Sequence, residues 1–394
     1  MLYKLEKEGE VLTSQVIQDE YTAKVIKAFD WDFKGENQFT CWHIPENYLP
    51  ENYGIGLIVG SSGSGKSTLL KQFGTPINIE WDNTKAIVSN FSTPDEAINK
   101  LTAVGLNSIP SWTKPFNVLS NGEQFRANLA RQLISKSVID EFTSVVDRNV
   151  AKACATSISK YIKKNNLQQL IFASCHRDII EWLEPDWIFD TDNGELLVGS
   201  CTSRPRIEIN IYETTRASWE LFKKHHYLSN EMNNACRCYL GVWNNQLVAF
   251  SGNLCLPGKI PPLYEGDTRG KFRESRLVVL PDYQGMGIGT RFSNAIGEIF
   301  LNNNYRYFSK TAHVRMGEYR QKSILWRATS TNLKSREKSQ KHSKKEKYKH
   351  IMLDTKRICY SHEYIGELDN KYRILYEEEL KKKELRKCLK NKKS

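Results

Sequence analysis

The sequence lacks long apolar runs, paired cysteine spacing and a signal-like start, and each absence excludes a class of protein. A membrane-spanning helix needs about 20 consecutive apolar residues, and no stretch approaches that length. The nine cysteines are an odd number, and Cys236 and Cys238 are too close together for ordinary zinc ligation, so we expect reduced thiols. Residues 1–10 alternate in charge, unlike a secretory signal. We therefore expect a soluble, cytoplasmic protein without a membrane contact.

Composition and charge then narrow the class of protein. The 394 residues are 40% apolar and 26% charged, which suits two or three folded domains. The net charge of +12 is concentrated late: residues 334–349 hold eight Lys/Arg against two Glu, and residues 381–393 hold eight against one. Such runs are most often solvated faces, but they also neutralise the phosphates of nucleic acids.

A glycine-rich loop with the features of a phosphate-binding P-loop follows an apolar run at residues 56–59. Apolar residues at helical spacing follow it, and this strand-loop-helix context disfavours the alternative of a Gly/Ser-rich turn that happens to contain a lysine. Its backbone N–H groups are expected to bind phosphate, with Lys66 at the outer phosphates and the Ser67 hydroxyl on Mg²⁺. The expected nucleotide-binding residues are Gly60, Ser61, Ser62, Gly63, Ser64, Gly65, Lys66, Ser67 and Thr68.

A second motif, residues 119–123, resembles the Leu-Ser-Gly-Gly-Gln signature of ATP-binding-cassette (ABC) ATPases. The third position is Asn121 and the fifth is Glu123, while Ser120 and Gly122 match the family. Physically the motif reads as a helix start capped by Ser120. The resemblance implies that Ser120, Asn121, Gly122 and Glu123 contact the γ-phosphate of ATP.

Two further strand ends fit the same family in the expected order. The short strand before Asp140 and Glu141 resembles Walker B, which implies that Asp140 holds Mg²⁺ and that Glu141 polarises the attacking water. His176 ends another apolar strand and takes the place of the switch histidine at the γ-phosphate, although a lone histidine there is usually structural. The glutamine that the family places between P-loop and signature is not evident, and Asn90 is the nearest candidate.

The resemblance also implies an assembly. In ABC ATPases the signature of one subunit completes the ATP site of another, so we expect an ATP-dependent homodimer. No membrane domain accompanies the cassette, which argues against a transmembrane transporter subunit. Before the P-loop, apolar residues at 16–29 suggest a helix that packs on the next domain, and Phe29, Trp31 or Phe33 can offer a ring to adenine or simply be core aromatics.

The second half contains a β-branched strand that runs into a Gln-Gly-x-Gly-x-Gly loop and then a helix. A nicotinamide-binding loop is excluded, because its glycines are spaced differently and it needs an acidic residue about 20 positions on. The stretch resembles motif A of GNAT acetyltransferases. That resemblance implies an acetyl-CoA site made of Leu277, Val278, Val279, Gln284, Gly285, Met286, Gly287, Ile288, Gly289 and Thr290.

The residues of acyl transfer are less specific. Glu274, just before the motif strand, is a candidate base, and Tyr319 is a candidate acid, although single acidic or aromatic residues are more often structural. The flanking residues also resemble a branch of GNAT proteins related to the phage DNA-modification protein Mom. This resemblance makes Tyr227, Ser275, Arg276 and His313 candidates for the substrate side.

Taken together, the sequence predicts an α/β protein with a P-loop ABC-ATPase domain followed by an α+β GNAT acyltransferase domain with a central mixed sheet. The expected boundaries are an N-terminal segment 1–15, the ATPase 16–199, a linker 200–206, the GNAT domain 207–367 with a basic insertion 333–349, and a basic tail 368–394. The predicted cofactors are ATP, Mg²⁺ and acetyl-CoA, and a nucleic-acid base is the favoured acceptor. The alternatives are a protein or small-molecule amine as acceptor, and a nucleic-acid-associated ATPase clamp with a non-catalytic GNAT fold.

Overall fold

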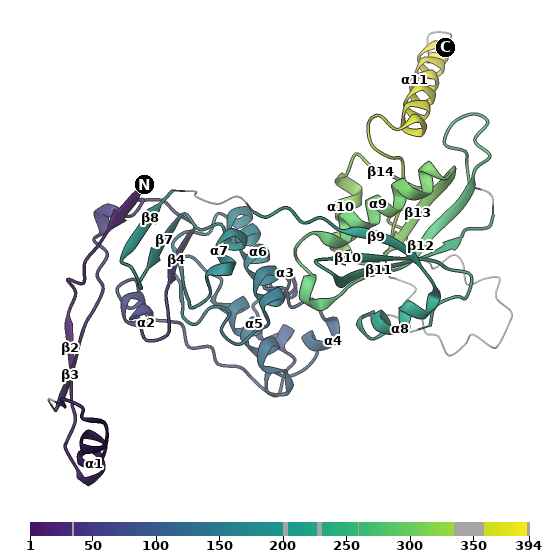
Figure 1. Ribbon diagram of the computed structural model, residues 1–394. Coiled ribbons are helices and arrows are strands. Elements are labelled where there is room, and N and C mark those ends of the chain that lie inside the picture. The colour runs from purple at the N-terminus through teal and green to yellow at the C-terminus, as the bar shows by residue number, and fades with distance from the viewer. Residues whose placement is uncertain (34, 200–203, 227–230, 259, 335–357, 392–394) are drawn as a thin grey trace. The chain divides into compact units, whose positions relative to one another are not determined.

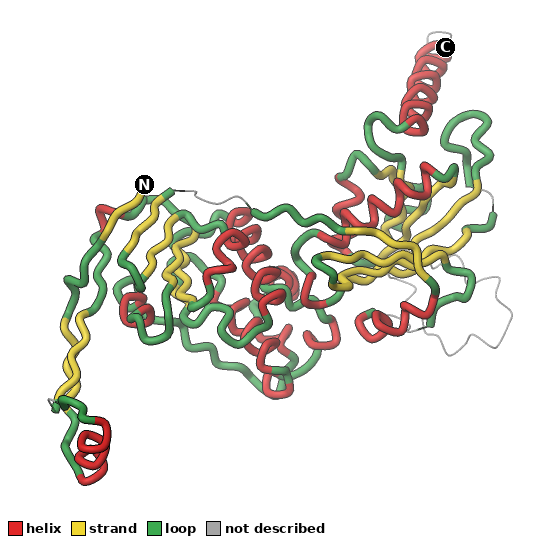
Figure 2. The backbone as a smooth tube through the Cα atoms, in the orientation of Figure 1, coloured by secondary structure: helices red, strands yellow, loops and turns green. Residues whose placement is uncertain are grey.

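The computed structural model describes residues 1–33, 35–199, 204–226, 231–258, 260–334 and 358–391 (Figure 1). The chain divides into two compact units. The first comprises residues 1–206 together with 281–286, and the second comprises residues 207–280 and 287–394. Both units contain helices and strands (Figure 2).

A six-stranded mixed sheet forms the centre of the first unit. Strand β4 (Ile55–Val59) pairs in parallel with β6 (Leu170–Ser174) on one side and with β7 (Trp187–Asp190) on the other. All residues of β4 and β6 are buried, as expected for central parallel strands covered on both faces. The sheet order is β1-β8-β7-β4-β6-β5, with β1 (Leu2–Lys4), β5 (Val138–Ile139) and β8 (Glu195–Val198) as the remaining strands.

Capping residues mark the ends of two helices of this unit. Thr93 accepts a hydrogen bond from the backbone N–H of Glu96 at 3.1 Å before the helix that Pro94 opens, and Asp147 caps the long helix that ends at the left-handed Asn166. Both are common helix-boundary signals. The helices are α2 (Lys66–Leu70), α3 (Pro94–Ala103), α4 (Ile109–Trp112), α5 (Asn121–Gln132), α6 (Arg148–Asn165) and α7 (Ile180–Leu183).

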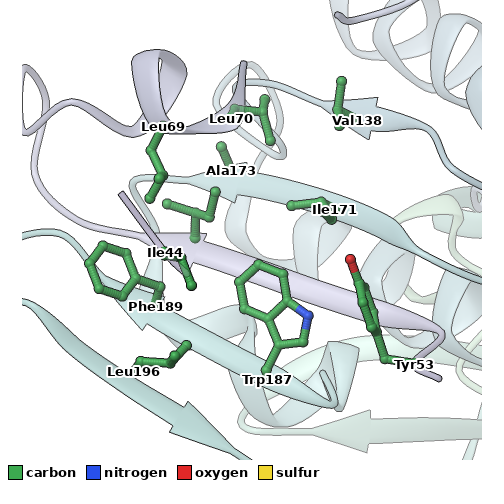
Figure 3. Packing of buried hydrophobic residues seen from close by; sticks show 11 residues of the cluster. Ile44, Tyr53, Leu69, Leu70, Val138, Ile171, Ala173, Trp187, Phe189 and Leu196 are labelled. Carbon is green, nitrogen blue, oxygen red and sulfur yellow. The ribbon is translucent and has the colours of Figure 1, made fainter. Parts of the chain in front are cut away.

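Trp187 lies at the centre of the core of this sheet (Figure 3). Its side chain is fully buried, and the rings of Tyr53 and Phe73 each lie 5.7 Å from its own. The neighbouring strand makes room for the indole at Gly56, where an added Cβ would lie 2.2 Å from the Trp187 ring. The absence of a side chain at Gly56 is therefore a packing requirement. The rest of the cluster is Ile44, Ile58, Leu69, Leu70, Val138, Ile171, Ala173, Phe189 and Leu196.

The N-terminal region contains an edge strand and an exposed helix. Residues Leu2–Lys4, within the predicted N-terminal segment 1–15, form the edge strand β1, which pairs with β8. The predicted helix forms as α1 (Glu20–Phe29), carried by a ribbon of β2 (Val11–Gln15) and β3 (Glu36–Thr40), but none of its residues is buried. The expectation that this helix packs on the rest of the domain is wrong.

A seven-stranded mixed sheet forms the second unit, in the order β14-β15-β13-β12-β11-β10-β9. The tight turn between β10 and β11 has two asparagines, Asn244 and Asn245, at positive φ, the combination that a two-residue hairpin turn favours. The strands are β9 (Asn210–Thr214), β10 (Arg237–Trp243), β11 (Gln246–Cys255), β12 (Gly270–Val279), β13 (Tyr305–Thr311), β14 (Trp326–Ala328) and β15 (Tyr360–Tyr364); the helices are α8 (Trp219–Phe222), α9 (Ile288–Asn302), α10 (Val314–Lys322) and α11 (Lys371–Asn391).

The predicted fold class is confirmed: both units are α/β, and each has a mixed central sheet. Among the residues that the structure describes, no helix combines the length and the apolar character needed to cross a bilayer. Seven cysteines in the described ranges are free thiols: Cys41, Cys154, Cys175, Cys236, Cys238, Cys255 and Cys359. Most of the predicted basic insertion, residues 335–349, and residues 200–203 of the predicted linker lie outside the described part of the chain.

The close approach of Gly56 to Trp187 generates a stability prediction. We expect Gly56→Ala to lower the free energy of unfolding by about 2–3 kcal/mol, because the new methyl group overpacks a buried ring. Urea unfolding followed by tryptophan fluorescence measures this change. As a control, Gly122→Ala places its Cβ 3.6 Å from Val146, an ordinary contact, and stability should not fall. Equal stability of the Gly56 variant and wild type would contradict the packing role.

Candidate functional site

Three segments that the sequence places far apart meet at one edge of the first sheet. The parallel register pairs Val59 of β4 with Ser174 of β6, and Ile139 of β5 with Phe172 of β6. The glycine-rich loop follows Val59, the two carboxylates follow Ile139, and His176 follows β6. Since the carboxyl ends of parallel strands meet at one edge, this is where ligands of open α/β sheets bind.

The glycine-rich loop has the backbone that its sequence predicts. Gly60, Gly63 and Gly65 all have positive φ angles, of 155°, 78° and 97°, and a Cβ on Gly60 would lie 2.0 Å from Thr191 Oγ1. The Lys66 ammonium donates to the carbonyls of Gly60 and Ser61, at 2.9 and 2.6 Å. The other predicted members, Ser62, Ser64, Ser67 and Thr68, lie in the same loop and in the first turn of α2.

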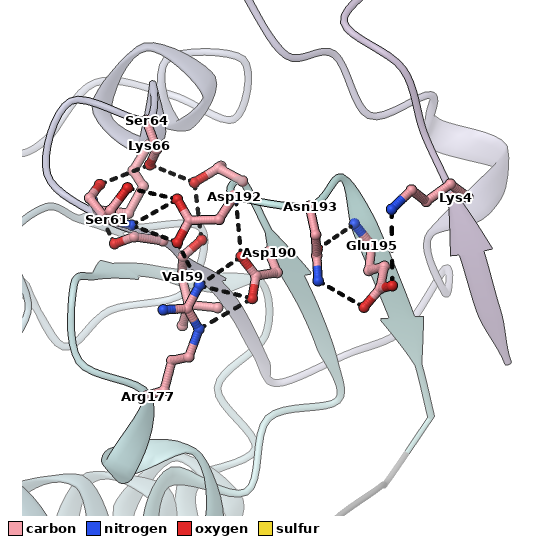
Figure 4. A network of polar contacts seen from close by, with 12 residues as sticks. Lys4, Val59, Ser61, Ser64, Lys66, Arg177, Asp190, Asp192, Asn193 and Glu195 are labelled. Atoms are coloured by element: carbon pink, nitrogen blue, oxygen red, sulfur yellow. Dashed lines mark hydrogen bonds and ion pairs between the residues drawn. The ribbon is translucent and has the colours of Figure 1, made fainter.

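An ionic network, drawn in Figure 4, ties this loop to the turn after β7. Asp192 accepts hydrogen bonds from the Ser61 N–H and hydroxyl, and Arg177 pairs with both Asp190 and Asp192. The hydrogen bond from Arg177, followed by those from Ser61, lowers the pKa of Asp192 to about 2. Ser61 was predicted from the sequence as part of the site, whereas Arg177, Asp190 and Asp192 were not.

The segment that carries the two carboxylates is also tightly held. Asp140 accepts a hydrogen bond from the backbone N–H of Glu141 at 2.8 Å, and Glu141 adopts a left-handed conformation with φ of 49°, which few non-glycine residues do. Thr143 Oγ1 lies 3.3 Å from Nδ1 of His176. The structure therefore brings the predicted Walker B segment and the predicted switch histidine together.

The electrostatic surroundings favour a neutral imidazole at His176. Burial and the nearby Arg148 lower its pKa, against the opposing effect of Asp178. A neutral ring presents one donor and one acceptor nitrogen. At neutral pH, His176 can therefore donate a hydrogen bond to an anion while accepting one from Thr143.

The signature segment begins α5 as predicted, and the contacts of Glu123 give a structural reason for a glutamate at the fifth position of the motif. Ser120 is the N-cap, and its N–H and hydroxyl both donate to Glu123, at 3.0 and 2.9 Å. The Ser111 hydroxyl donates to the other carboxylate oxygen at 2.6 Å. Burial acts to raise the pKa of Glu123, but these hydrogen bonds outweigh it and hold that pKa below its ordinary value. Glu123, where the family has glutamine, completes a capping box, with Asn121 and Gly122 in the first turn.

The structure also locates the candidate for the missing glutamine and two of the rings proposed to stack on adenine. Asn90, the candidate for the missing glutamine, hydrogen-bonds to its own turn through Asp82 and Ala86. The proposed adenine-stacking rings Phe29 and Trp31 are 78% and 67% exposed, on the α1 side of the β2–β3 ribbon.

Two aromatic rings near the loop were missed by the sequence analysis. A Cβ on Gly65 would lie 2.6 Å from Phe39 and 3.7 Å from Trp42. Lys7 covers both rings, at 4.8 and 5.3 Å from their centroids. The available signal was their position shortly before the P-loop strand, but only the fold shows that the chain returns to the loop at this point.

In the second unit, the motif strand β12 separates from its parallel neighbour β13 part-way along its length. Pairing between β12 and β13 ends at Glu274 and Ser309, whereas β12 continues to Val279 on β11 alone. The register shift on β11 leaves Ser275 as the extra residue of a β-bulge. Leu277, Val278 and Val279 therefore follow the point of separation.

The loop after β12 leads into α9. Gly285 and Gly287 have φ angles of 88° and 87°, and Gly287 is the N-cap of α9. A Cβ on Gly289 would lie 3.3 Å from Val279, so a larger residue there would crowd the end of the strand. The remaining predicted loop members are Gln284, Met286, Ile288 and Thr290, whose hydroxyl donates to the Gly287 carbonyl at 3.1 Å.

The candidate base Glu274 forms a buried ion pair. Its carboxylate accepts from Arg320 of α10 at 2.9 and 3.1 Å and from the hydroxyls of Ser293 and Ser309 at 2.7 and 3.1 Å. Both carboxylate oxygens are thus engaged, which is how a buried carboxylate is stabilised. The role of Glu274 as a base stays a prediction, and its contacts are those of a structural pair.

The other predicted acyl-transfer residues are spread around α10 and β12. The Tyr319 hydroxyl accepts a hydrogen bond from Asn294 at 2.7 Å. His313 caps α10; desolvation by the atoms around its ring and the cationic Arg315 lower its pKa. Arg276 donates to the carbonyls of Ser275 and Glu231, at 2.9 and 2.6 Å. Tyr227 lies outside the described residues.

No protein-family model matches the chain, and no curated protein matches it. Solved structures with similar folds include a bacterial ABC transporter cassette in dimeric form, 15% identical with a TM-score of 0.28, covering 36% of this chain and 83% of that one. An acetyltransferase from Bacillus subtilis in complex with CoA is 13% identical with a TM-score of 0.27, covering 40% and 98%. A GNAT family acetyltransferase from Elizabethkingia anophelis with acetyl-CoA bound is 14% identical with a TM-score of 0.26, covering 39% and 94%. These similarities are weak and partial, and they concern the fold.

The contacts of Glu274 generate a prediction that separates a structural role from a catalytic one. We expect Glu274→Gln to lower the free energy of unfolding by about 3 kcal/mol, because it leaves the Arg320 cation buried without a charged partner. Urea unfolding measures the loss. The matched control is Lys223→Gln, which breaks an exposed pair with Glu220 and should change stability by less than about 0.5 kcal/mol. Unchanged stability in Glu274→Gln, with the loss of the acidic limb in the pH profile of acyl transfer, would restore the base hypothesis.

Proposed function

We propose that the first unit binds and hydrolyses ATP. The observation that carries this proposal is the meeting of the glycine-rich loop, Asp140 with Glu141, and His176 at the carboxyl edge of one parallel sheet. Phosphoryl transfer needs little covalent help from a protein, and consists largely of positioning and charge stabilisation. A loop with a lysine, a carboxylate pair and a neutral histidine supplies those functions.

The individual roles follow from the chemistry of each group. The backbone N–H groups of residues 60–68 bind the phosphates, and Lys66 exchanges its loop carbonyls for the outer phosphate oxygens. Glu141 orients the attacking water and accepts its proton, while the neutral His176 donates a hydrogen bond to the γ-phosphate. The rings of Phe39 and Trp42, which lie beside Gly65, supply a stacking surface for adenine.

Mg²⁺ is the metal that fits these donors. The Ser67 hydroxyl and the Asp140 carboxylate are oxygen ligands, and Mg²⁺ is commonly held by one or two carboxylates, waters and substrate phosphates rather than by a complete protein cage. In the described part of the chain, no group of three or more His, Cys, Asp or Glu side chains is placed to hold a metal. Bound Mg²⁺ would neutralise charge on the phosphates.

The signature segment supports a dimer. Asn121 and Gly122 lie in the first turn of α5, where N-terminal N–H groups favour an anion, and this chain has a single copy of each motif. We propose that α5 of one subunit completes the ATP site of another. ATP then holds the homodimer together, and hydrolysis releases it.

For the second unit we propose acyl transfer from acetyl-CoA to an amine. The separation of β12 from β13 after Glu274 leaves the backbone of residues 275–279 with β11 as its ladder partner, available to the pantetheine arm. Residues 287–290, at the start of α9 in the same unit, offer N–H groups to the pyrophosphate. The amine nitrogen attacks the thioester carbonyl, an amide C–N bond forms, the C–S bond breaks, and the amine proton is lost as the CoA thiolate is protonated, with Tyr319 as the candidate acid.

A nucleic-acid base is the proposed acceptor. The support is electrostatic: the chain carries a net charge of +12, and the described lysines of α11, Lys381, Lys382 and Lys383, are exposed. The Mom-like residues Ser275, Arg276 and His313 would face this substrate. A base in a duplex must be extruded before it can reach a thioester, which gives an ATP-driven clamp a purpose. Proteins and small amines are the alternative acceptors.

A second candidate function is a nucleic-acid-associated ATPase clamp whose GNAT fold binds acyl-CoA without transferring the acyl group. The observation that favours it is the engagement of Glu274 by Arg320, Ser293 and Ser309. In this case Glu274 holds Arg320 in place and does not remove a proton from an amine.

Nucleoside mass spectrometry tests the proposed transfer. DNA and RNA from cells that express wild type should contain a nucleoside heavier by an acyl group. Gly287→Glu should lose it, because a charged side chain at positive φ blocks the loop, and Glu141→Gln should lose it if hydrolysis drives the reaction. No new nucleoside in wild-type cells would argue for another acceptor or for the clamp.

Size-exclusion chromatography with light scattering tests the proposed dimer. Glu141→Gln should elute as a dimer with Mg²⁺ and ATP and as a monomer without nucleotide, because ATP stays bound when the attacking water is not activated. Lys66→Ala should remain monomeric in both conditions. A Glu141→Gln protein that binds ATP yet stays monomeric would contradict assembly across two subunits.

A further inference from the structure

Ser61, in the first turn of the glycine-rich loop, is held from two sides by groups of opposite charge. Its N–H donates to Asp192 at 2.9 and 3.0 Å, and its hydroxyl donates to the same carboxylate at 2.7 Å. Its carbonyl accepts from the Lys66 ammonium at 2.6 Å. One residue of backbone therefore separates a carboxylate from the ammonium group proposed to bind the outer phosphates (Figure 4).

Arg177 compensates this carboxylate and the one beside it. Its guanidinium lies 2.6 Å from Asp192 and 2.9 Å from Asp190, with a second hydrogen bond from Nε to Asp190 at 3.1 Å. The arginine directly follows His176 in the chain, whereas the two aspartates end β7 and begin the next turn. Arg177 thus joins the segment after β6 to the turn after β7, and Asp192 joins that turn to the glycine-rich loop.

The charges at this position act against nucleotide binding unless they are neutralised. Asp192 is ionised throughout the physiological range, because the hydrogen bonds of Arg177 and Ser61 lower its pKa to about 2. A negative charge beside a phosphate site repels the nucleotide in proportion to the charge of both. Two carboxylates and one guanidinium leave a net charge of −1, and removal of the guanidinium would leave −2.

We propose that Arg177 is a positioning residue of the ATP site, which holds Asp192 on Ser61 and cancels its charge so that the loop accepts a triphosphate. The inference rests on the proposed ATP binding of the first unit. It assigns Asp192 a role as well: the carboxylate fixes the first turn of the loop, at an electrostatic cost that Arg177 removes. A purely structural role for Arg177 predicts a different response to nucleotide charge, which makes the two distinguishable.

Calorimetric titration of the full chain with ATP, ADP and AMP in the presence of Mg²⁺ tests this role. Arg177→Gln should weaken ATP binding roughly three- to tenfold at low salt, with a smaller loss for ADP and the smallest for AMP. The loss should shrink at high salt, because the groups are partly exposed and their charges are screened. In the Arg177→Gln background, Asp192→Asn should recover most of the ATP affinity, since the amide oxygen still accepts from Ser61 while the negative charge is gone.

Two controls separate this effect from general destabilisation. Arg204→Gln removes an arginine from a comparable pair with Glu184, at 2.8 Å in the same unit, and should leave nucleotide affinity unchanged. The melting temperatures of the Arg177 and Arg204 variants should be similar. An equal loss for all three nucleotides, a loss independent of salt, or no recovery with Asp192→Asn would overturn the inference, as would unchanged affinity in Arg177→Gln. If wild type itself binds no ATP, the proposed ATPase function fails and this role fails with it.

Discussion

Parallel pairing of β4 with β6 is the constraint on which the first unit depends. The register that sets Val59 opposite Ser174 determines that the loop after one strand and the histidine after the other share an edge. Slippage is disfavoured because both strands are buried, and a slip of one residue would move side chains to the opposite face. On the other side of β4, the Trp187 indole of β7 packs closely over Gly56. The chemistry at the edge is therefore a consequence of core packing beneath it.

In the second unit, a buried ion pair lies where two parallel strands separate. Strands β12 and β13 pair as far as Glu274 and Ser309, which form the last pair. Arg320 of α10 contacts both side chains there. Burying charges is costly unless they are paired and hydrogen-bonded, and here the hydroxyls of Ser293 and Ser309 complete the coordination of the carboxylate. The ion pair thus lies at the point where β12 separates from β13.

Local sequence patterns predicted individual segments well. The strand, loop and helix around Gly60 to Lys66 and the capped helix at Ser120 form as the residues indicate, because the determinants of a turn or a cap lie within a few positions. The α1 helix also forms, yet its apolar side chains are exposed. Periodicity indicates that a helix has an apolar face, but it does not say what covers that face.

The sequence by itself determined the order of the motifs and the local strand, loop and helix segments around them, since these follow from short-range periodicity and backbone preference. The fold class was implied by the resemblance of those motifs to known families. Only the tertiary structure decided which distant side chains meet. The pairing of Glu274 with Arg320 spans 46 positions, and that of Ser61 with Asp192 spans 131. Such contacts depend on strand register and helix packing across the whole domain, which no local pattern encodes. For this reason the glycine-rich loop could be predicted from the sequence, whereas its contacts with Asp192 and Arg177 could not.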